Sequence, residues 1–162
     1  MPANGYVEEL LGVRGCALAG SSTEIDKGRR LQTFDLEYCG PVPQDCPQCG
    51  GTLHSHGTRS MTVAATPHLG APTKLAIEFP RMRCSACGFV WRPEIGGVDE
   101  THRMTEAAYA DIAQRSLRLT FREVADEYPL SHVTVKNVFE DFVCENAARL
   151  RFKVPAFLGI DE

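Results

Sequence analysis

The chain lacks any long hydrophobic run. No stretch of its 162 residues approaches the roughly 20 apolar residues that a transmembrane helix needs. The first part of the chain carries Glu8, Glu9 and Arg14 and has no uninterrupted apolar core, which argues against a secretory signal peptide. We therefore expect a cytoplasmic protein with no membrane partner.

The chain also lacks an excess of positive charge. Its formal net charge is −4 at pH 7, so any binding to nucleic acid must depend on a local patch rather than on global attraction. The composition, 43% hydrophobic and 23% charged, is typical of a globular protein and excludes a largely disordered one. The length fits one ordinary domain or about two to three very small ones.

The cysteines do not form an even set, and their spacing favours a metal over disulfides. There are seven of them, which suits reduced thiols in the cytoplasm. Two equal pairs, Cys46 with Cys49 and Cys84 with Cys87, each leave two residues between the thiols, so that one tight turn presents both sulfurs. Zn²⁺ binds four such sulfurs tetrahedrally and keeps no open position for water. The sequence therefore predicts a structural zinc site made of these four residues.

Glycines and histidines around the pairs leave some alternatives open. Gly50 and Gly88 each follow the second cysteine of a pair, where the turn needs a residue that tolerates a positive φ. A redox dithiol would also explain a single pair. His54 and His56 are alternative ligands or exposed loop histidines.

The other three cysteines, Cys16, Cys39 and Cys144, are expected to be buried small hydrophobic residues. Cys39, shortly before the first pair, has the further option of being a spare ligand.

Hydrophobic periodicity divides the chain into four segments. Residues 1–45 read as a short helix or strand and then two strands, packed on the zinc module. Residues 46–100 form that module, in which "MTVAATP" and "TKLAIEFPRMRC" are strands separated by Pro–Gly-rich turns. Residues 101–150 change to a helical period, and residues 151–162 contain one short apolar run, "FLGI".

Three helices are expected in the third segment. The first has one apolar face, made of Tyr109, Ile112, Ala113 and Leu117. Thr120 and Glu123 have the spacing of a capping box, which starts a short second helix from Phe121 to Glu127.

The third helix follows Tyr128-Pro129 and has Ser131 as its N-cap. Its apolar face is expected to contain Val135, Val138, Phe142 and Val143. A short middle helix and a tight turn before the third are typical of a helix-turn-helix, although unrelated helix bundles share this pattern.

In a helix-turn-helix the start of this last helix reads base edges in the DNA major groove. Asn contacts adenine, Lys contacts guanine or phosphate, and a helix N-terminus binds phosphate. The expected contacts are Ser131, His132, Thr134, Lys136 and Asn137, with phosphate contacts from Arg59, Arg81 and Arg83 in the zinc module. The alternative is that these are solvated polar side chains on an ordinary surface.

Several motifs occur in a recognisable order: "CPQCGG", "HSHGTRS", "FPRMRCSACGFVWRPE", the three helices and "FLGIDE". This order, from about Glu8 onward, resembles the ISL family of bacterial insertion-sequence transposases. The resemblance implies an α+β fold: a small β-rich zinc-ribbon-like module, a three-helix helix-turn-helix unit, and at 151–162 the orphan first strand of a ribonuclease-H-like domain. By resemblance Asp161 matches the first of three catalytic carboxylates, which hold Mg²⁺ in an intact enzyme.

The resemblance implies the DNA-binding N-terminal part of a DDE-type transposase. Its partner would be double-stranded DNA at the element's terminal inverted repeats, with room for a homo-oligomer. Because the second and third carboxylates are missing from the sequence, we expect that the chain by itself is not an enzyme. The alternatives are a small zinc-containing DNA-binding repressor or transposition inhibitor, and a zinc-stabilised protein-interaction module with no role in DNA binding.

Overall fold

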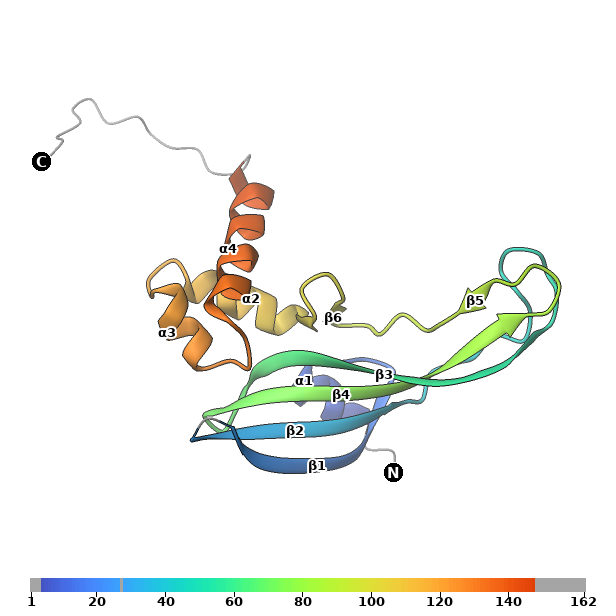
Figure 1. Cartoon of the computed structure of the whole chain (residues 1–162), viewed down its shortest axis with the longest axis horizontal. Helices are drawn as coiled ribbons and strands as arrows, with labels where there is room; N and C mark the ends of the chain where they lie inside the picture. Colours follow the sequence, from blue (N-terminus) through green and yellow to red (C-terminus); the bar gives the residue numbers. More distant parts are fainter. Residues whose placement is uncertain (1–3, 27, 148–162) are drawn as a thin grey trace, which may run out of the picture.

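The computed structural model describes residues 4–26 and 28–147. They form a seven-stranded sheet with one helix on a face and three helices at one end (Figure 1). The predicted mixture of helices and strands is confirmed, whereas the expected strand at 151–162, with Asp161, lies outside the described residues. The elements are α1 (Asn4–Leu11), β1 (Cys16–Asp26), β2 (Arg29–Tyr38), β3 (Leu53–His68), β4 (Ala71–Cys84), β5 (Val90–Trp91), β6 (Val98–Asp99), β7 (Met104–Thr105), α2 (Glu106–Arg115), α3 (Phe121–Asp126) and α4 (His132–Ala147).

The sheet has the strand order β1-β2-β4-β3-β7-β6, and β5 pairs with β4. Most neighbours are antiparallel, but β3 runs parallel to β7, and β2 runs parallel to β4, with Gln32 opposite Thr73 and Glu37 opposite Glu78. The cysteine-containing segment thus shares one sheet with the N-terminal strands. The domain boundaries predicted from the sequence remain predictions.

The long hairpin of β3 and β4 dominates the molecule. Its pairing extends from His68 opposite Ala71 to Leu53 opposite Cys84, and the register shifts twice, between Ser55 and Thr58 and between Ala65 and His68. Beyond Glu78 the hairpin leaves β2 and projects from the sheet, as Figure 1 shows. We call this projection the arm (residues 44–60 and 79–91).

The strand boundaries differ from those expected. Strand β3 begins at Leu53 rather than near Met61, so that a segment expected to be loop is part of the hairpin. The turn is not Pro–Gly-rich: it consists of Leu69 and Gly70, with φ angles of 50° and 74°. Two consecutive positive φ angles match the right-handed twist of a hairpin, which is why a two-residue turn suffices here.

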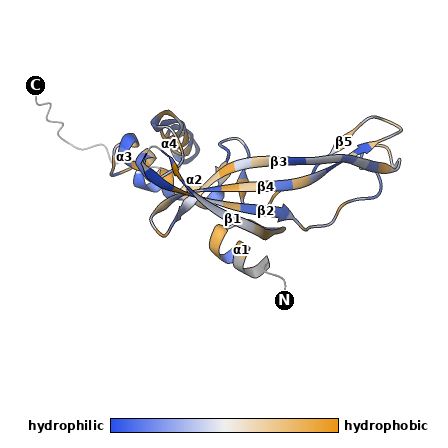
Figure 2. Cartoon of the chain, turned by 60° about the horizontal axis from the view of Figure 1, so that its bottom comes forward, coloured by the Kyte–Doolittle hydropathy of each residue, from blue (hydrophilic) through white to orange (hydrophobic). Residues whose placement is uncertain are grey.

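The main core lies between α1 and the sheet. Val7 and Leu11 of α1 pack against strand residues that include Leu36, Leu75 and Ile77, which are at most 1% exposed. In β4 the apolar residues alternate with half-buried ones, because α1 covers one face only (Figure 2). Cys16 belongs to this core, whereas Cys46 and Cys84 belong to a separate small cluster, so the packing of the sheet does not depend on the paired cysteines.

The three C-terminal helices form a second core on the opposite face of β3, because Ala64 points away from its neighbours Val63 and Ala65, which belong to the main core. Ile112 of α2, Val124 of α3 and Val135 of α4 are fully buried against one another, and Ala64 of β3 joins them. The expectation for Leu117 was wrong. It follows the end of α2 and is 61% exposed.

The predicted capping box is confirmed. The Thr120 hydroxyl accepts a hydrogen bond from the Glu123 backbone N–H at 3.3 Å, and the Glu123 carboxylate accepts one from the Thr120 N–H at 2.8 Å. None of the described helices is long and apolar enough to cross a membrane.

His102 connects the loop before the helices to α4. Its Nδ1 lies 2.6 Å from an Asp99 carboxylate oxygen and its Nε2 lies 2.9 Å from one of Asp141. Burial alone lowers the pKa of His102, but its hydrogen bonds to the two carboxylates outweigh burial and raise that pKa above its ordinary value. A protonated imidazole donates to both carboxylates at once. The protonated form of His102 therefore connects Asp141 of α4 to Asp99 at the end of β6.

We predict that this contact makes stability depend on pH. A raised folded pKa means that the stabilisation is complete below the unfolded pKa of about 6.5 and is lost as pH rises through the folded value. His102→Gln should therefore reduce the free energy of unfolding more at about pH 5.5 than at about pH 8.5, by a difference on the order of 0.5–1 kcal/mol, and the melting temperature should fall more at the lower pH. Thermal unfolding of both proteins at the two pH values is the measurement. His54→Gln, which alters an exposed histidine, is the control, and an equal effect of His102→Gln at both pH values would contradict the prediction.

Candidate metal centre and nucleic-acid interface

The four predicted cysteine ligands come together at the end of the arm. The sulfurs of Cys46, Cys49, Cys84 and Cys87 all lie within 4.8 Å of one another. The Sγ–Sγ distances are 3.7 Å between Cys46 and Cys87 and 3.5 Å between Cys49 and Cys84. Four sulfurs about 2.3 Å from a tetrahedral Zn²⁺ are separated by about 3.8 Å. The donor set and its spacing thus fit structural zinc.

Each cysteine pair forms the same turn. The N–H of Gly50 donates to the carbonyl of Cys46 at 2.9 Å, and the N–H of Gly88 donates to that of Cys84 at 3.1 Å. Both glycines have positive φ angles, 71° and 77°, as the sequence predicted. The two turns face each other because the β3–β4 register brings Leu53 opposite Cys84.

A third glycine keeps space free beside the sulfurs. A Cβ atom at Gly51 would lie 3.2 Å from the sulfur of Cys84 and 3.4 Å from that of Cys49. Any larger residue would push against two of the four ligands. The two glycines after Cys49 therefore have separate roles. Gly50 adopts the positive φ of the turn, and Gly51 leaves space for the sulfurs because it has no side chain.

The protonation of the thiols also suits a cation. The backbone N–H of Cys87 has the largest influence on the Cys84 thiol and, with the N–H of Ala86 and neighbouring thiols, lowers its pKa to about 6 despite burial. At Cys49 the Gly51 N–H lowers the pKa, but the thiols of Cys87 and Cys84 outweigh it and raise the pKa to about 12. One thiolate forms readily and its neighbours then resist ionisation, which a bound divalent cation would relieve.

Other cysteines and histidines lie outside this cluster. His54 and His56 are exposed and belong to strand β3 rather than to a loop. Cys16 is buried as expected, at 1% exposure. The same expectation was wrong for Cys39 and Cys144, which are exposed. Of the described residues with potential metal ligands, only the four cysteines form a group.

Helix α4 presents one buried and one exposed face. Val135 and Val138 are fully buried against α2 and α3, as predicted. Ser131 precedes the helix, and its Oγ accepts a hydrogen bond from the Thr134 backbone N–H at 3.1 Å, as expected of an N-cap. The expectation for Val143 was wrong, because it is exposed, at 36%.

The predicted DNA-contacting residues divide into two groups on this helix. His132, Lys136 and Asn137 are exposed, whereas Thr134 is half-buried and its hydroxyl lies 3.0 Å from that of Ser131. Lys136 lies 3.3 Å from Glu140, a pair of exposed side chains that contributes little to stability and exchanges easily. Their assignment as DNA contacts remains a prediction.

One exposed residue of the same face was missed. Val133 is 53% exposed, and the helical period places it between Lys136 and Asn137 on the outer side. The signal in the sequence was an apolar residue out of phase with Val135 and Val138. An apolar side chain in this place suits the methyl group of thymine.

The three arginines predicted as phosphate contacts do not lie together. Arg59 and Arg81 line one hollow of the arm, with Arg92 and Arg103. Arg83 lines another, beside Cys84, where it is opposite His54 in the register. Arg103 was missed because it lies beyond the zinc-module charges that the sequence analysis grouped together.

We predict that the tip of the arm, and not the whole zinc module, depends on metal. Its apolar contacts are few: Leu53 with the buried cysteines, and Met82, Phe89 and Trp91 beside them. Such a cluster is too small to hold its shape unaided. Cys84→Ser should therefore reduce bound zinc from about one ion per chain to nearly none. Amides of residues 44–54 and 82–91 should exchange with solvent quickly, while those of the main sheet stay protected.

Metal analysis and hydrogen exchange by mass spectrometry test this prediction. Cys144→Ser is the matched control, because it removes an exposed thiol that is not part of the cluster. A Cys84→Ser protein that keeps both its zinc and a protected tip would show that the four-cysteine assignment is wrong.

Two family models match the chain, and both cover elements described above. Residues 43–87 match the zinc-finger of transposase IS204/IS1001/IS1096/IS1165, a segment that contains all four cysteines and the β3–β4 hairpin. Residues 94–143 match the helix-turn-helix domain of transposase family ISL3, a segment that contains α2, α3 and most of α4. No curated protein and no solved structure matches the chain significantly. With its zinc-finger and its helix-turn-helix in this order, the chain belongs to the ISL3 family of transposases.

Proposed function

We propose that the chain binds double-stranded DNA and recognises the ends of an insertion-sequence element, with α4 as the recognition helix. The observation that carries this proposal is the outer face of α4, where His132, Val133, Lys136 and Asn137 are exposed next to one another. The match of residues 94–143 to a transposase helix-turn-helix supports the same assignment.

The packing of α4 is suited to this task. Val135 and Val138 fix the helix against α2 and α3, so its outer side chains are presented from a rigid support. The cap from Ser131 orders the first turn, which is the part of a recognition helix that reaches base edges. In this proposal α2, α3 and α4 form the helix-turn-helix.

The exposed side chains of α4 are suited to a DNA site that contains both A·T and G·C base pairs. Asn137 is able to form two hydrogen bonds with adenine, Lys136 donates to guanine or phosphate, and Val133 contacts a thymine methyl group. Glu140 and Asp141 follow one turn later, where their charge repels phosphate. They limit the reading surface to the first two turns of α4.

The zinc-bound tip has a supporting role in the proposal. With metal bound, the tip holds a rigid end on a narrow two-stranded arm, which would otherwise have few contacts of its own. We propose that Zn²⁺ acts there as a structural ion only, because four sulfurs leave no coordination position for a substrate.

We predict that the double variant Lys136→Ala with Asn137→Ala loses sequence discrimination. The preferred duplex is first selected with the unaltered chain from a pool with about 16 randomised base pairs, which spans more than one helical turn. Fluorescence anisotropy then compares affinities for this duplex and for a shuffled one. The ratio should fall by about tenfold or more in the double variant, since each bidentate contact contributes about 1–3 kcal/mol of discrimination.

Glu24→Ala, on the exposed edge strand β1, is the control and should leave the ratio unchanged. Retained discrimination in the double variant would remove α4 from base reading. No affinity for any duplex at low salt, with zinc bound and the chain folded, would instead favour the alternative of a zinc-stabilised protein-interaction module.

A further inference from the structure

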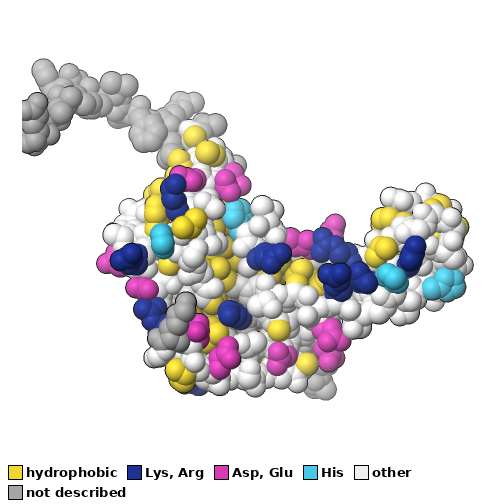
Figure 3. Space-filling view, in the orientation of Figure 1, with side chains coloured by type: hydrophobic (Ala, Val, Ile, Leu, Met, Phe, Trp, Pro, Cys, Tyr) yellow, Lys and Arg dark blue, Asp and Glu magenta, His cyan; other side chains and the backbone are white. Residues whose placement is uncertain are grey.

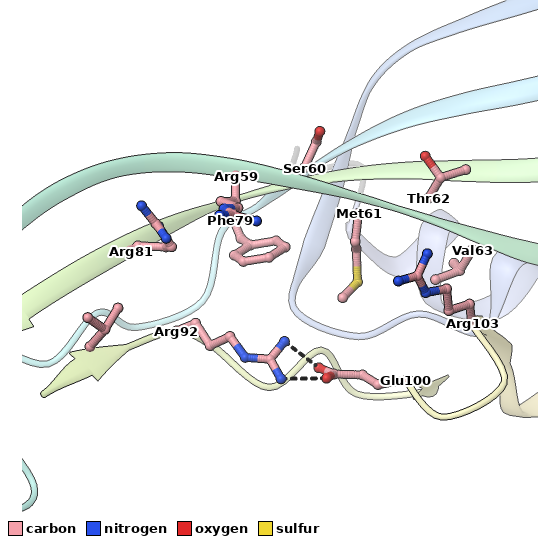
Figure 4. Close-up of a pocket in the computed structure, with 11 residues that line it drawn as sticks. Arg59, Ser60, Met61, Thr62, Val63, Phe79, Arg81, Arg92, Glu100 and Arg103 are labelled. Carbon is pink, nitrogen blue, oxygen red and sulfur yellow. Dashed lines mark hydrogen bonds and ion pairs between the residues drawn. The ribbon is translucent and has the colours of Figure 1, made fainter.

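Four arginines surround a cleft between the arm and the segment that leads to the helices. Arg59 of β3 and Arg81 of β4 contribute one side, and Arg92 and Arg103 contribute the other (Figure 4). The cleft has a volume of about 600 Å³, and Phe79 lies in its wall. The register places Arg59 directly opposite Phe79, so both project on the same face of the hairpin.

Most of this positive charge is uncompensated. The guanidinium groups of Arg59 and Arg103 form no hydrogen bond or ion pair with any residue that the structure describes. The Nη2 of Arg81 donates weakly to the His56 carbonyl at 3.4 Å, while its Nε is buried and has no partner among the described residues. A buried donor without a protein partner favours an acceptor beside it, such as a phosphate oxygen or a water molecule.

The backbone at Arg103 is unusual for an arginine. Its φ is 54°, in the left-handed region that glycine and asparagine adopt more easily. The backbone is fixed there because its carbonyl accepts a hydrogen bond from the Ala64 N–H at 2.9 Å. In this conformation the Arg103 side chain extends over β3 beside Met61 and Val63 (Figure 4).

One anion already occupies part of the cleft. Arg92 holds the Glu100 carboxylate through two parallel hydrogen bonds, of 3.0 Å and 2.6 Å. A phosphodiester group presents two oxygens in the same forked arrangement and is bound by arginine in the same way. Glu100 is exposed and its ion pair is at the mouth of the cleft, so a phosphate is able to displace it.

We infer that this cleft binds backbone phosphates of duplex DNA, as a second contact that reads no bases, and that Glu100 competes with them for Arg92. The inference rests on the proposed DNA-binding function and adds a site to it. Phosphate contacts of this kind fix the position of a protein on the duplex, while base contacts determine sequence.

The cleft and the helical unit are neighbours along β3. The helical unit contacts β3 at Ala64, and Arg59 lies five residues earlier, about 17 Å along an extended strand. Lys and Arg side chains also gather on the face seen in Figure 3, from the helices to the narrow part where the arm leaves the sheet.

The first test compares cleft variants across a salt series. Arg59→Ala and Arg103→Ala should each weaken binding of a duplex of about 30 base pairs severalfold and reduce the slope of log K against log[salt] by about 0.9. Glu100→Gln should act in the opposite direction and raise the affinity severalfold, because it releases Arg92. Glu24→Gln makes the same change in net charge on β1 and is the matched control. Each variant is checked for bound zinc and for an unchanged melting temperature.

The second test locates the contact on the DNA. The selected duplex is extended by about ten base pairs, roughly one helical turn, on one side or on the other. One of the two extensions should strengthen binding, and Arg59→Ala should abolish that gain without altering the ratio between selected and shuffled sequences.

The outcomes separate this inference from the proposed function. If the unaltered chain binds DNA but both arginine variants keep its salt slope, or Glu100→Gln matches Glu24→Gln, the cleft is not a phosphate site. If the arginine variants weaken binding of a single-stranded oligonucleotide as much as that of the duplex, the duplex assignment is wrong. If no duplex is bound at all, the proposed function fails first. A salt slope reduced by about 0.9 in each arginine variant, with sequence discrimination intact, supports the phosphate site in the cleft.

Discussion

The pairing of β3 with β4 is the constraint on which the rest of the structure depends. The register of this hairpin, which contains two shifts, places Leu53 opposite Cys84, Arg59 opposite Phe79 and Ala64 opposite Lys74. The first pair closes the metal centre, the second forms a wall of the arginine cleft, and Ala64 is the contact with the helical core. A shift by one residue would turn every side chain to the other face and would disrupt all three at once.

The hairpin extends far beyond the sheet because its tip is stabilised separately from the main core. Residues near Leu75 and Ile77 are buried by α1, but the tip has only a small apolar cluster around Leu53 and Trp91. A two-stranded ribbon of this kind is marginal in water. Metal ligation stabilises the tip of the hairpin, and hydrophobic burial stabilises its part within the sheet. One pair of strands thus has two sources of stability.

Motifs made of residues close in sequence were predicted correctly. Features that depend on contacts between distant parts of the chain were not predicted. The two cysteine pairs and the capping box at Thr120 depend on residues a few positions apart, whose geometry is the same in any fold. The parallel pairing of β2 with β4 and the exposure of Cys144 depend on partners far along the chain. Arg103 was missed for the same reason, since only the fold brings it across to Arg59.

The charge distribution explains how a chain with a net charge of −4 can still bind a polyanion. Its acidic residues are not spread evenly against the basic ones. Arg92 and Lys136 each have an exposed carboxylate as partner, Glu100 and Glu140, whereas Arg59 and Arg103 have none among the described residues. Exposed ion pairs contribute little to stability and are screened by salt. Phosphate must displace them, so in the proposed DNA complex they weaken binding to phosphate of any sequence and leave more of the affinity to base contacts.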